Sequence, residues 1–257
     1  MPQLSSKVGL IVGVANKRSI AWAIAQAAAA DGAALTLTYQ NDRLAENVRE
    51  LAQSLPNAAV LPCDVGVDAQ MDALFAAIEQ QHGGLDFVVH GAAFAPPEEL
   101  SRPFVQTSRE GFRVAMDVSV YSFVALARRA APLMEARGGG SLLTLTYLGS
   151  ERVFPNYNVM GVAKAALEAA VRYLANDLGP KGIRVNAVSA GPIKTLAASG
   201  ISGFSSILQH YRDRAPLRRT VDASEIAEAA VFLLGPSGRA VTAEVLMVDG
   251  GYHASGM

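Results

Sequence analysis

Short apolar segments that are typical of buried strands alternate with segments of helical periodicity along most of this chain. Val8 to Val12 predicts a first strand, and a glycine turn then leads into an alanine-rich helix from about Ser19 to Ala30. Ala34 to Tyr39 predicts the next strand, which completes one βαβ unit. Further strands are expected at Ala59–Pro62, Leu85–His90, Ser141–Thr146, Gly182–Val188 and Val245–Val248. Further helices are expected at Arg43–Ser54, Ala69–Gln81, Phe104–Val118, Tyr121–Ala136, Ala223–Leu234, and from Tyr157 toward Leu178.

This alternation favours a mostly parallel sheet that is covered by helices on both faces. The sequence contains neither a repeat of fixed period nor a low-complexity linker that would divide it. We therefore predict one Rossmann-like, doubly wound α/β domain over residues 1–257. In such a fold, ligands bind outside the carboxyl ends of the strands.

The composition of the 257 residues excludes several classes of protein. Apolar residues make up 51% and charged residues 18%, with a net charge of -1, so general nucleic-acid binding is not expected. The one cysteine, Cys63, cannot form an internal disulfide, and the four histidines lack metal-ligand spacing with it. We expect a reduced cytoplasmic compartment and no metal. The start of the chain lacks a secretory signal, and no apolar run reaches membrane-spanning length.

The turn after the first predicted strand has features of a nucleotide site, although it is not a GxGxxG motif. Gly13 permits a tight turn, the Ser19 hydroxyl could donate to phosphate, and amides from Ile20 onward begin a helix that favours an anion. The alternative interpretation is a glycine turn followed by a serine that caps the helix.

Polar residues also follow the second and third predicted strands. Gln40 stands where a Rossmann site often places an acidic residue against the adenosine ribose, and it could bind ribose hydroxyls without repelling phosphate. We therefore expect a preference for NADH over NADPH. Asp64 and Val65 could hold the adenine edge, but Asp64 could instead cap the helix that begins near Asp68.

Tyr157 precedes Lys164 by seven positions. In a helix, positions i and i+7 project within about 20° of each other and lie about 10.5 Å apart along the axis. A nearby ammonium favours the phenolate, so this pair predicts an acid and its electrostatic partner. Two residues that share one helix face by chance would give the same spacing.

Several motifs together resemble the enoyl-acyl-carrier-protein reductases, a divergent branch of the short-chain dehydrogenase/reductases. The motifs are Gly13-x5-Ser19-Ile20-Ala21, Cys63–Val65, Thr146–Lys164 and Gly191–Ile201, and the resemblance covers essentially the whole chain. It implies an NADH-dependent enzyme of fatty-acid synthesis that reduces trans-2-enoyl thioesters of acyl-carrier-protein or coenzyme A. It also implies a homotetramer.

Ordinary short-chain dehydrogenases carry Tyr-x3-Lys, which would require tyrosine where Met160 stands. Counting back from that position to their catalytic serine leads to Tyr147. The resemblance implies that Tyr157 stabilises the enolate oxygen while hydride reaches C3, and that Lys164 binds the nicotinamide ribose. Tyr147 could position the thioester, or it could be an aromatic packing residue. The displaced phenol disfavours a 3-oxoacyl or other carbonyl reductase, and the intact pair disfavours a dinucleotide-sensing protein without turnover.

The remaining candidate residues follow later predicted strands. Gly91 would allow close approach to the cofactor, and Ile193 and Thr195 could meet the nicotinamide carboxamide. Residues 195–215 are expected to form a helical segment that covers the acyl chain. The residues expected to line the substrate pocket are Phe94, Ala95, Tyr147, Tyr157, Met160, Ala197, Ile201 and Phe204.

Overall fold

The computed structural model describes residues 2–195 and 203–255, and within these ranges seven strands form one sheet. Their order is β3-β2-β1-β4-β5-β6-β7, and all the neighbouring strands pair in parallel. The strands are β1 Val8–Val12, β2 Ala34–Tyr39, β3 Ala58–Pro62, β4 Phe87–His90, β5 Gly140–Thr146, β6 Ile183–Ala190 and β7 Val245–Val248. The strand order changes direction at β1: β2 and β3 lie on one side of β1, and the chain then crosses to β4 on its other side.

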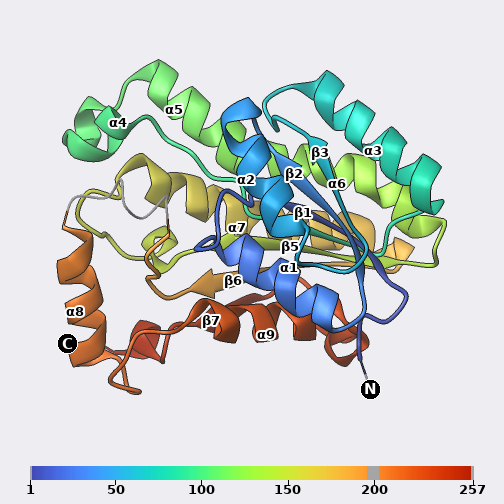
Figure 1. The fold of residues 1–257 in the computed structure, drawn as a ribbon. Coiled ribbons are helices and arrows are strands. Elements are labelled where there is room, and N and C mark those ends of the chain that lie inside the picture. The colour runs from blue at the N-terminus through green and yellow to red at the C-terminus, as the bar shows by residue number, and fades with distance from the viewer. Residues whose placement is uncertain (1, 196–202, 256–257) are drawn as a thin grey trace.

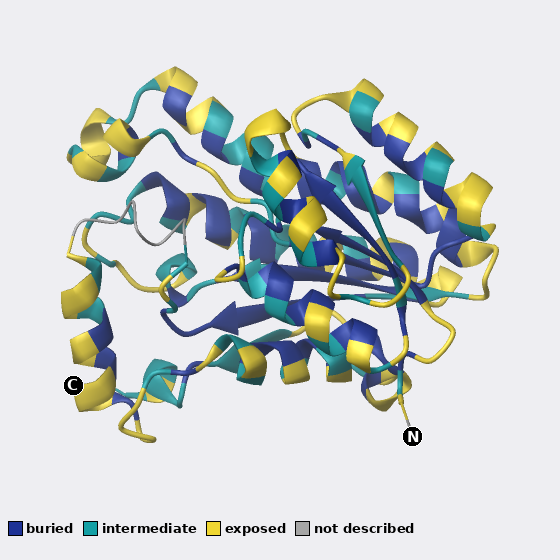
Figure 2. Ribbon diagram, viewed as in Figure 1, coloured by how far each residue is buried: buried dark blue, intermediate teal, exposed yellow. Residues whose placement is uncertain are grey.

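Helices cover both faces of this sheet (Figure 1). One hydrophobic cluster joins the sheet to α1 (Ile20–Ala30), α2 (Asp42–Ala52) and α9 (Ala223–Leu234). A second cluster joins the other face to α3 (Asp68–His82), α6 (Ser122–Glu135) and α7 (Val159–Leu178). Buried strands lie between helices whose outer faces are exposed, as Figure 2 shows. The predicted Rossmann-like, doubly wound class is confirmed.

The elements that surround the expected site lie at the carboxyl end of the sheet, toward which the β6 arrow points in Figure 1. They are α4 (Pro97–Ser101), α5 (Arg109–Met116) and α8 (Phe204–Arg214). A π-helical turn, Asp117–Tyr121, joins α5 to α6. Short 3-10 turns occupy Phe104–Gln106, Leu148–Ser150, Gly179–Lys181, Pro236–Gly238 and Tyr252–Ala254.

The predicted helix Phe104–Val118 is wrong in its first part. Phe104 begins only a short 3-10 turn, and α5 starts after Ser108, whose hydroxyl accepts a hydrogen bond from the Gly111 amide at 2.9 Å. The segment is divided at Thr107 and Ser108, because Thr107 has a non-helical backbone and the Ser108 side chain caps a new helix. Helix α4 was not predicted.

The expectation that Tyr157 lies on the long helix is also wrong. Helix α7 begins at Val159, and Asn158 has φ 40° and ψ -117°, which is not a helical conformation. Tyr157 therefore lies in the turn before the helix, and the angle and rise of an i, i+7 helical pair do not apply to Tyr157 and Lys164.

None of the described helices is long and apolar enough to cross a membrane. The described residues also contain no group of three or more His, Cys, Asp or Glu side chains that could hold a metal ion. Cys63 is buried, and burial raises the pKa of its thiol to about 11.

Candidate active site

The loops after β1 and β4 meet backbone to backbone. Gly13 has φ 102°, and a Cβ at this position would lie 2.5 Å from the carbonyl carbon of Gly91. A Cβ on Gly91 would lie 2.9 Å from the carbonyl oxygen of Val12. Glycine at both positions therefore brings two chain segments together at the start of α1, where a phosphate can approach the backbone.

Ser19 stands at the N-cap position of α1, but its side chain does not bond to the first turn of that helix. Instead its hydroxyl oxygen accepts hydrogen bonds from the amides of Ala15 and Asn16, both at 3.1 Å. A hydroxyl has one hydrogen to donate in addition. Ser19 thus shapes the loop while it can still donate to an anion, beside the Ile20 amide that begins the helix.

Gln40 and Asp64 lie together at the ends of β2 and β3. The Gln40 amide donates to Asp64 Oδ2 at 3.3 Å, and Asp64 Oδ1 accepts from the Gly66 amide at 2.9 Å. Helix α3 has Val67 as its N-cap, so the alternative role of Asp64 as a helix cap is wrong. Gln40 is exposed, whereas Val65 is buried in the core.

Tyr157 packs against Tyr147, which also contacts Phe154. Its ring meets Tyr147 edge to face at 5.2 Å, and Tyr147 in turn lies 4.9 Å from Phe154. Burial raises the pKa of Tyr157 well above its usual range, and Tyr147 and Glu168 raise it further. The expected lowering of this pKa is therefore wrong, and Tyr157 is a protonated phenol that can donate a hydrogen bond at neutral pH.

Lys164 is buried in the first half of α7, and its Nζ donates to the carbonyl oxygen of Leu145 at 2.8 Å. Burial lowers its pKa to about 8, although the nearby Glu168 opposes that shift. Glu168 also accepts a hydrogen bond from the Thr146 hydroxyl at 2.5 Å. At pH 7 the amine is still mostly charged, so the site holds a cation at the end of β5.

A small apolar cluster adjoins Tyr157. Ala95, Val159 and Met160 are buried in it, together with Ala115, and Tyr157 and Leu100 pack against it. Three of the predicted substrate residues, Ala95, Met160 and Tyr157, are thus brought together.

Phe94, next in the chain, keeps 50% of its surface exposed although its amide donates to the Ser119 hydroxyl at 3.0 Å. The ring is therefore not packed into the core, which disfavours a loop-packing role.

The remaining predicted residues lie on two other segments. Ile193 packs against the first core cluster, and its carbonyl accepts from the Thr195 amide at 2.8 Å. Ala197 and Ile201 lie outside the described residues. Phe204 is the half-buried first residue of α8.

Sequence reasoning missed Tyr211, which is 1% exposed on α8. Its hydroxyl donates to the Tyr147 hydroxyl at 3.4 Å, and its ring stacks on Tyr252 at 3.7 Å. The spacing of Phe204, Leu208 and Tyr211 is that of one helix face, and this pattern could have identified the residue.

Comparisons with known proteins identify the family of this chain. The family model for enoyl-(acyl carrier protein) reductase matches residues 13–253. The chain belongs to the enoyl-acyl-carrier-protein reductase family. It is 55% identical to enoyl-acyl-carrier-protein reductase (NADH) 1 of Rhizobium meliloti, over 99% of this chain and 93% of that protein.

Solved structures of the family have the same fold. The Bacillus cereus enoyl-acyl-carrier-protein reductase, crystallised with NADP+ and an indole naphthyridinone, is 52% identical with a TM-score of 0.97, and the match covers 100% of both chains. The Aquifex aeolicus reductase (NADH) is 47% identical with a TM-score of 0.95, over 99% of both chains. The family assignment therefore extends over the whole site, from Gly13 to α8.

A nicotinamide cofactor of this family fits the residues present. The Gly13 and Gly91 backbones pack directly on one another at the start of α1, and the first turn of that helix presents amides to a phosphate. Gln40 carries an exposed amide just after β2, and Lys164 supplies a buried donor near the end of β5.

Proposed function

We infer that this protein is an NADH-dependent enoyl-acyl-carrier-protein reductase of fatty-acid synthesis, which converts trans-2-enoyl thioesters to saturated thioesters. The observation that carries this inference is a neutral, partly buried Tyr157 phenol beside an apolar cluster, with buried Met160 where a carbonyl reductase would need its tyrosine. The curated relatives, named as NADH-dependent reductases at about half identity, support the same activity.

Each residue of the substrate site has a distinct task in this reaction. NADH, when bound, supplies the hydride that reaches C3 of the substrate. Tyr157 donates a hydrogen bond to the thioester oxygen, where negative charge develops as the hydride arrives at C3. Lys164 binds the nicotinamide ribose and adds positive charge. Tyr147 packs against Tyr157 and positions the thioester, and a proton at C2 completes the saturation.

The nucleotide half binds the rest of the cofactor. Gly13, Ser19 and Ile20 hold the pyrophosphate. Asp64 and Val65 border the adenine, and Gly91 allows the cofactor to approach the backbone closely. Gln40 contacts ribose hydroxyls, and we expect NADH to be preferred because the uncharged Gln40 side chain offers no positive charge to a 2′-phosphate. The ratio of kcat/KM for NADH and NADPH measures this preference, and a strong preference for NADPH would contradict it.

Residues 195–215 cover the acyl chain in this proposal, and α8 is the described part of that cover. Its inner face reaches Tyr147 through Tyr211. Phe94, Ala95, Met160 and Phe204 contact the acyl chain. Ile193 and Thr195 bind the nicotinamide carboxamide.

The decisive assay follows NADH oxidation with a crotonyl thioester, with a 3-oxoacyl thioester, and with neither. We expect oxidation with the crotonyl thioester alone. Turnover of the 3-oxoacyl thioester would favour a carbonyl reductase, and no turnover of either with intact NADH binding would favour a dinucleotide sensor. Running carrier-protein and coenzyme-A thioesters in parallel measures what the carrier contributes to affinity.

We also propose a homotetramer in the cytoplasm. Large apolar side chains are exposed on α5, the π-helical turn and α7, where a second copy would cover them. They are Phe112, Tyr121, Val162 and Tyr173. Light scattering of the purified protein tests the tetramer, and a monomer at micromolar concentration would contradict it.

A further inference from the structure

Asn158 separates Tyr157 from the helix that carries Lys164. At φ 40° and ψ -117° its backbone lies in a region that residues other than glycine rarely adopt. If Asn158 were helical, α7 would extend back over Tyr157, and the phenol would project from the helix surface. Instead the Tyr157 ring lies over Gly149, where an added Cβ would be only 2.5 Å from Tyr157 Cδ1. The position of the phenol therefore depends on the conformation of Asn158.

The Asn158 side chain does not act as an ordinary helix cap. An asparagine at the N-cap position usually accepts a hydrogen bond from an amide of the first turn. Among the described contacts Asn158 makes no such bond, although it occupies that position in α7. Its side-chain nitrogen donates instead to the carbonyl oxygens of Leu100 at 2.9 Å and Arg102 at 2.8 Å. Both hydrogens of the amide are thus used on a segment more than fifty positions earlier in the chain.

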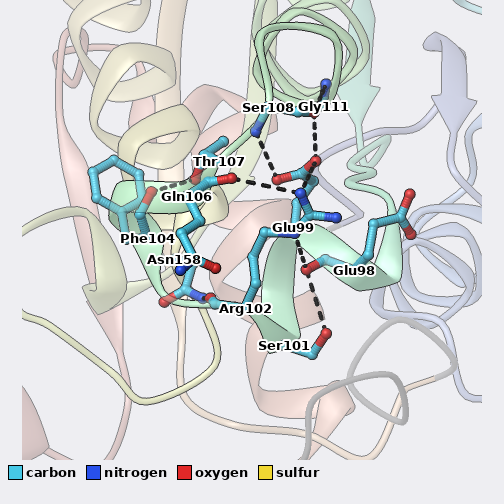
Figure 3. Close-up of polar contacts among 10 residues, drawn as sticks. All are labelled: Glu98, Glu99, Ser101, Arg102, Phe104, Gln106, Thr107, Ser108, Gly111 and Asn158. Atoms are coloured by element: carbon cyan, nitrogen blue, oxygen red, sulfur yellow. Dashed lines mark hydrogen bonds and ion pairs between the residues drawn. The ribbon is translucent and has the colours of Figure 1, made fainter.

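The segment that accepts these bonds is itself held in place, as Figure 3 shows. Glu99 is 2% exposed, and its carboxylate accepts from the Ser108 amide at 3.1 Å and the Ser108 hydroxyl at 2.6 Å. Arg102 lies 3.7 Å from the same carboxylate, and its Nε donates to the Glu98 carbonyl at 3.0 Å. A Cβ on Gly111 would collide with Glu99, so α5 packs directly against this carboxylate.

The same segment is also a wall of the apolar cluster. Leu100, whose carbonyl accepts from Asn158, packs with Tyr157 against Val159 and Met160. A shift of α4 would therefore move both an apolar neighbour of the phenol and the anchor of the residue beside it.

We propose that Asn158 is a positioning residue for Tyr157. Its amide fastens the turn before α7 to the carbonyls of Leu100 and Arg102 at the end of α4, and this holds the backbone in the conformation that aims the phenol at the thioester oxygen. The role rests on the proposed function. A misplacement of about 1 Å in such a group can lower the rate about 100-fold, so the anchor matters without touching the substrate.

Two variants separate the amide from the backbone conformation. Asn158→Gly keeps the positive φ available but removes the anchor, whereas Asn158→Asp keeps the size and the capping ability but has no hydrogens to donate. We expect both to lower kcat with crotonyl thioester about 10- to 100-fold, with KM for NADH within about twofold of the wild type. The matched controls are Asn57→Gly and Asn57→Asp, since Asn57 also has positive φ (55°) but is exposed before β3.

A double-mutant cycle distinguishes positioning from a general structural role. If Asn158 acts through the phenol, Asn158→Gly should lower kcat in the wild type but have almost no further effect in Tyr157→Phe. Equal effects in both backgrounds would overturn the proposal, as would a near-normal kcat in Asn158→Gly. An inactive wild type would instead refute the proposed function. Should either Asn158 variant fail to fold, Glu99→Gln, which loosens the acceptor segment, must show the same dependence on Tyr157, and an additive effect there would overturn the proposal.

Discussion

In the proposed nucleotide half of the site, which comprises Gly13 to Ile20, Gln40, Asp64 and Gly91, contacts between backbone segments set the shape of the surface. In the substrate half, which comprises α4, Tyr147, Tyr157 and α8, side chains from distant segments place the reacting groups. Gly13 and Gly91 meet without any side chain between them, whereas Tyr157 depends on the amide of Asn158 and on aromatic neighbours. The nucleotide half therefore depends on the close approach of two backbone segments, and the substrate half on individual side-chain contacts.

The largest expected effect is on the substrate half. Tyr157→Phe removes the donor to the thioester oxygen but keeps the ring that packs on Tyr147. We expect kcat to fall about 100- to 1,000-fold while KM for NADH changes little, because the nucleotide half is untouched. Single-turnover reduction of crotonyl thioester measures this. A near-normal rate in Tyr157→Phe would refute the assignment.

Lys164 lies between the two halves and gives a prediction on pH. Its pKa in the folded protein is about 8, below the ordinary value of 10.5, so between these two pH values the unfolded chain binds more protons. The folded state therefore gains stability from this group as pH rises through that window. Below pH 8 the lysine is charged in both states, and the full cost of burying the ammonium remains.

Lys164→Met removes this titration. The free energy of unfolding of the wild type, minus that of the variant, should increase by on the order of 3 kcal/mol between pH 7 and pH 10.5. Urea unfolding of both proteins at several pH values measures the difference, in which the other titrating groups cancel. A difference that does not change with pH would show that Lys164 is not buried as a charge.

Gly13→Ala tests whether the backbone contact governs the nucleotide half. The new Cβ would meet the Gly91 backbone, and φ 102° is strained for alanine, so we expect a loss of about 1–3 kcal/mol in stability and a clear rise in KM for NADH. The control is Gly83→Ala, which also has positive φ (66°) but has no atom within 4 Å of the added Cβ. Equal KM values in the two variants would break the proposed link between this contact and cofactor binding.

The smallest expected effect is that of Tyr211→Phe. The variant loses one long hydrogen bond to Tyr147, at 3.4 Å, but keeps the stacking on Tyr252. We expect kcat/KM for the crotonyl thioester to fall only about twofold, the weak limit for a hydrogen bond. Tyr211→Ala, which also loses the stacking, should have a larger effect. Equal effects in the two variants would show that the ring contributes nothing to the arrangement of α8.

The elements of the sheet could be predicted from the sequence because each depends on local periodicity. The bounds of β1, β2, β7 and α9 agree with the prediction. The segment from residue 97 to 108 could not be predicted in the same way, since its form depends on a buried carboxylate, Glu99, that bonds to Ser108. From the charge of Glu99 alone, an exposed side chain would be expected.

In the candidate site, too, some features could be predicted from the sequence and others depend on tertiary contacts. The sequence alone determined the fold class, the glycine turn and the presence of Tyr157 and Lys164, because residue types, their order and their spacing are properties of the chain itself. The tertiary structure decided that Tyr157 lies outside α7, that burial raises its pKa, and that Tyr211 reaches Tyr147. These features arise from contacts between segments far apart in the chain, and neither the carbonyls that hold Asn158 nor the burial around Tyr157 exists until those segments pack together.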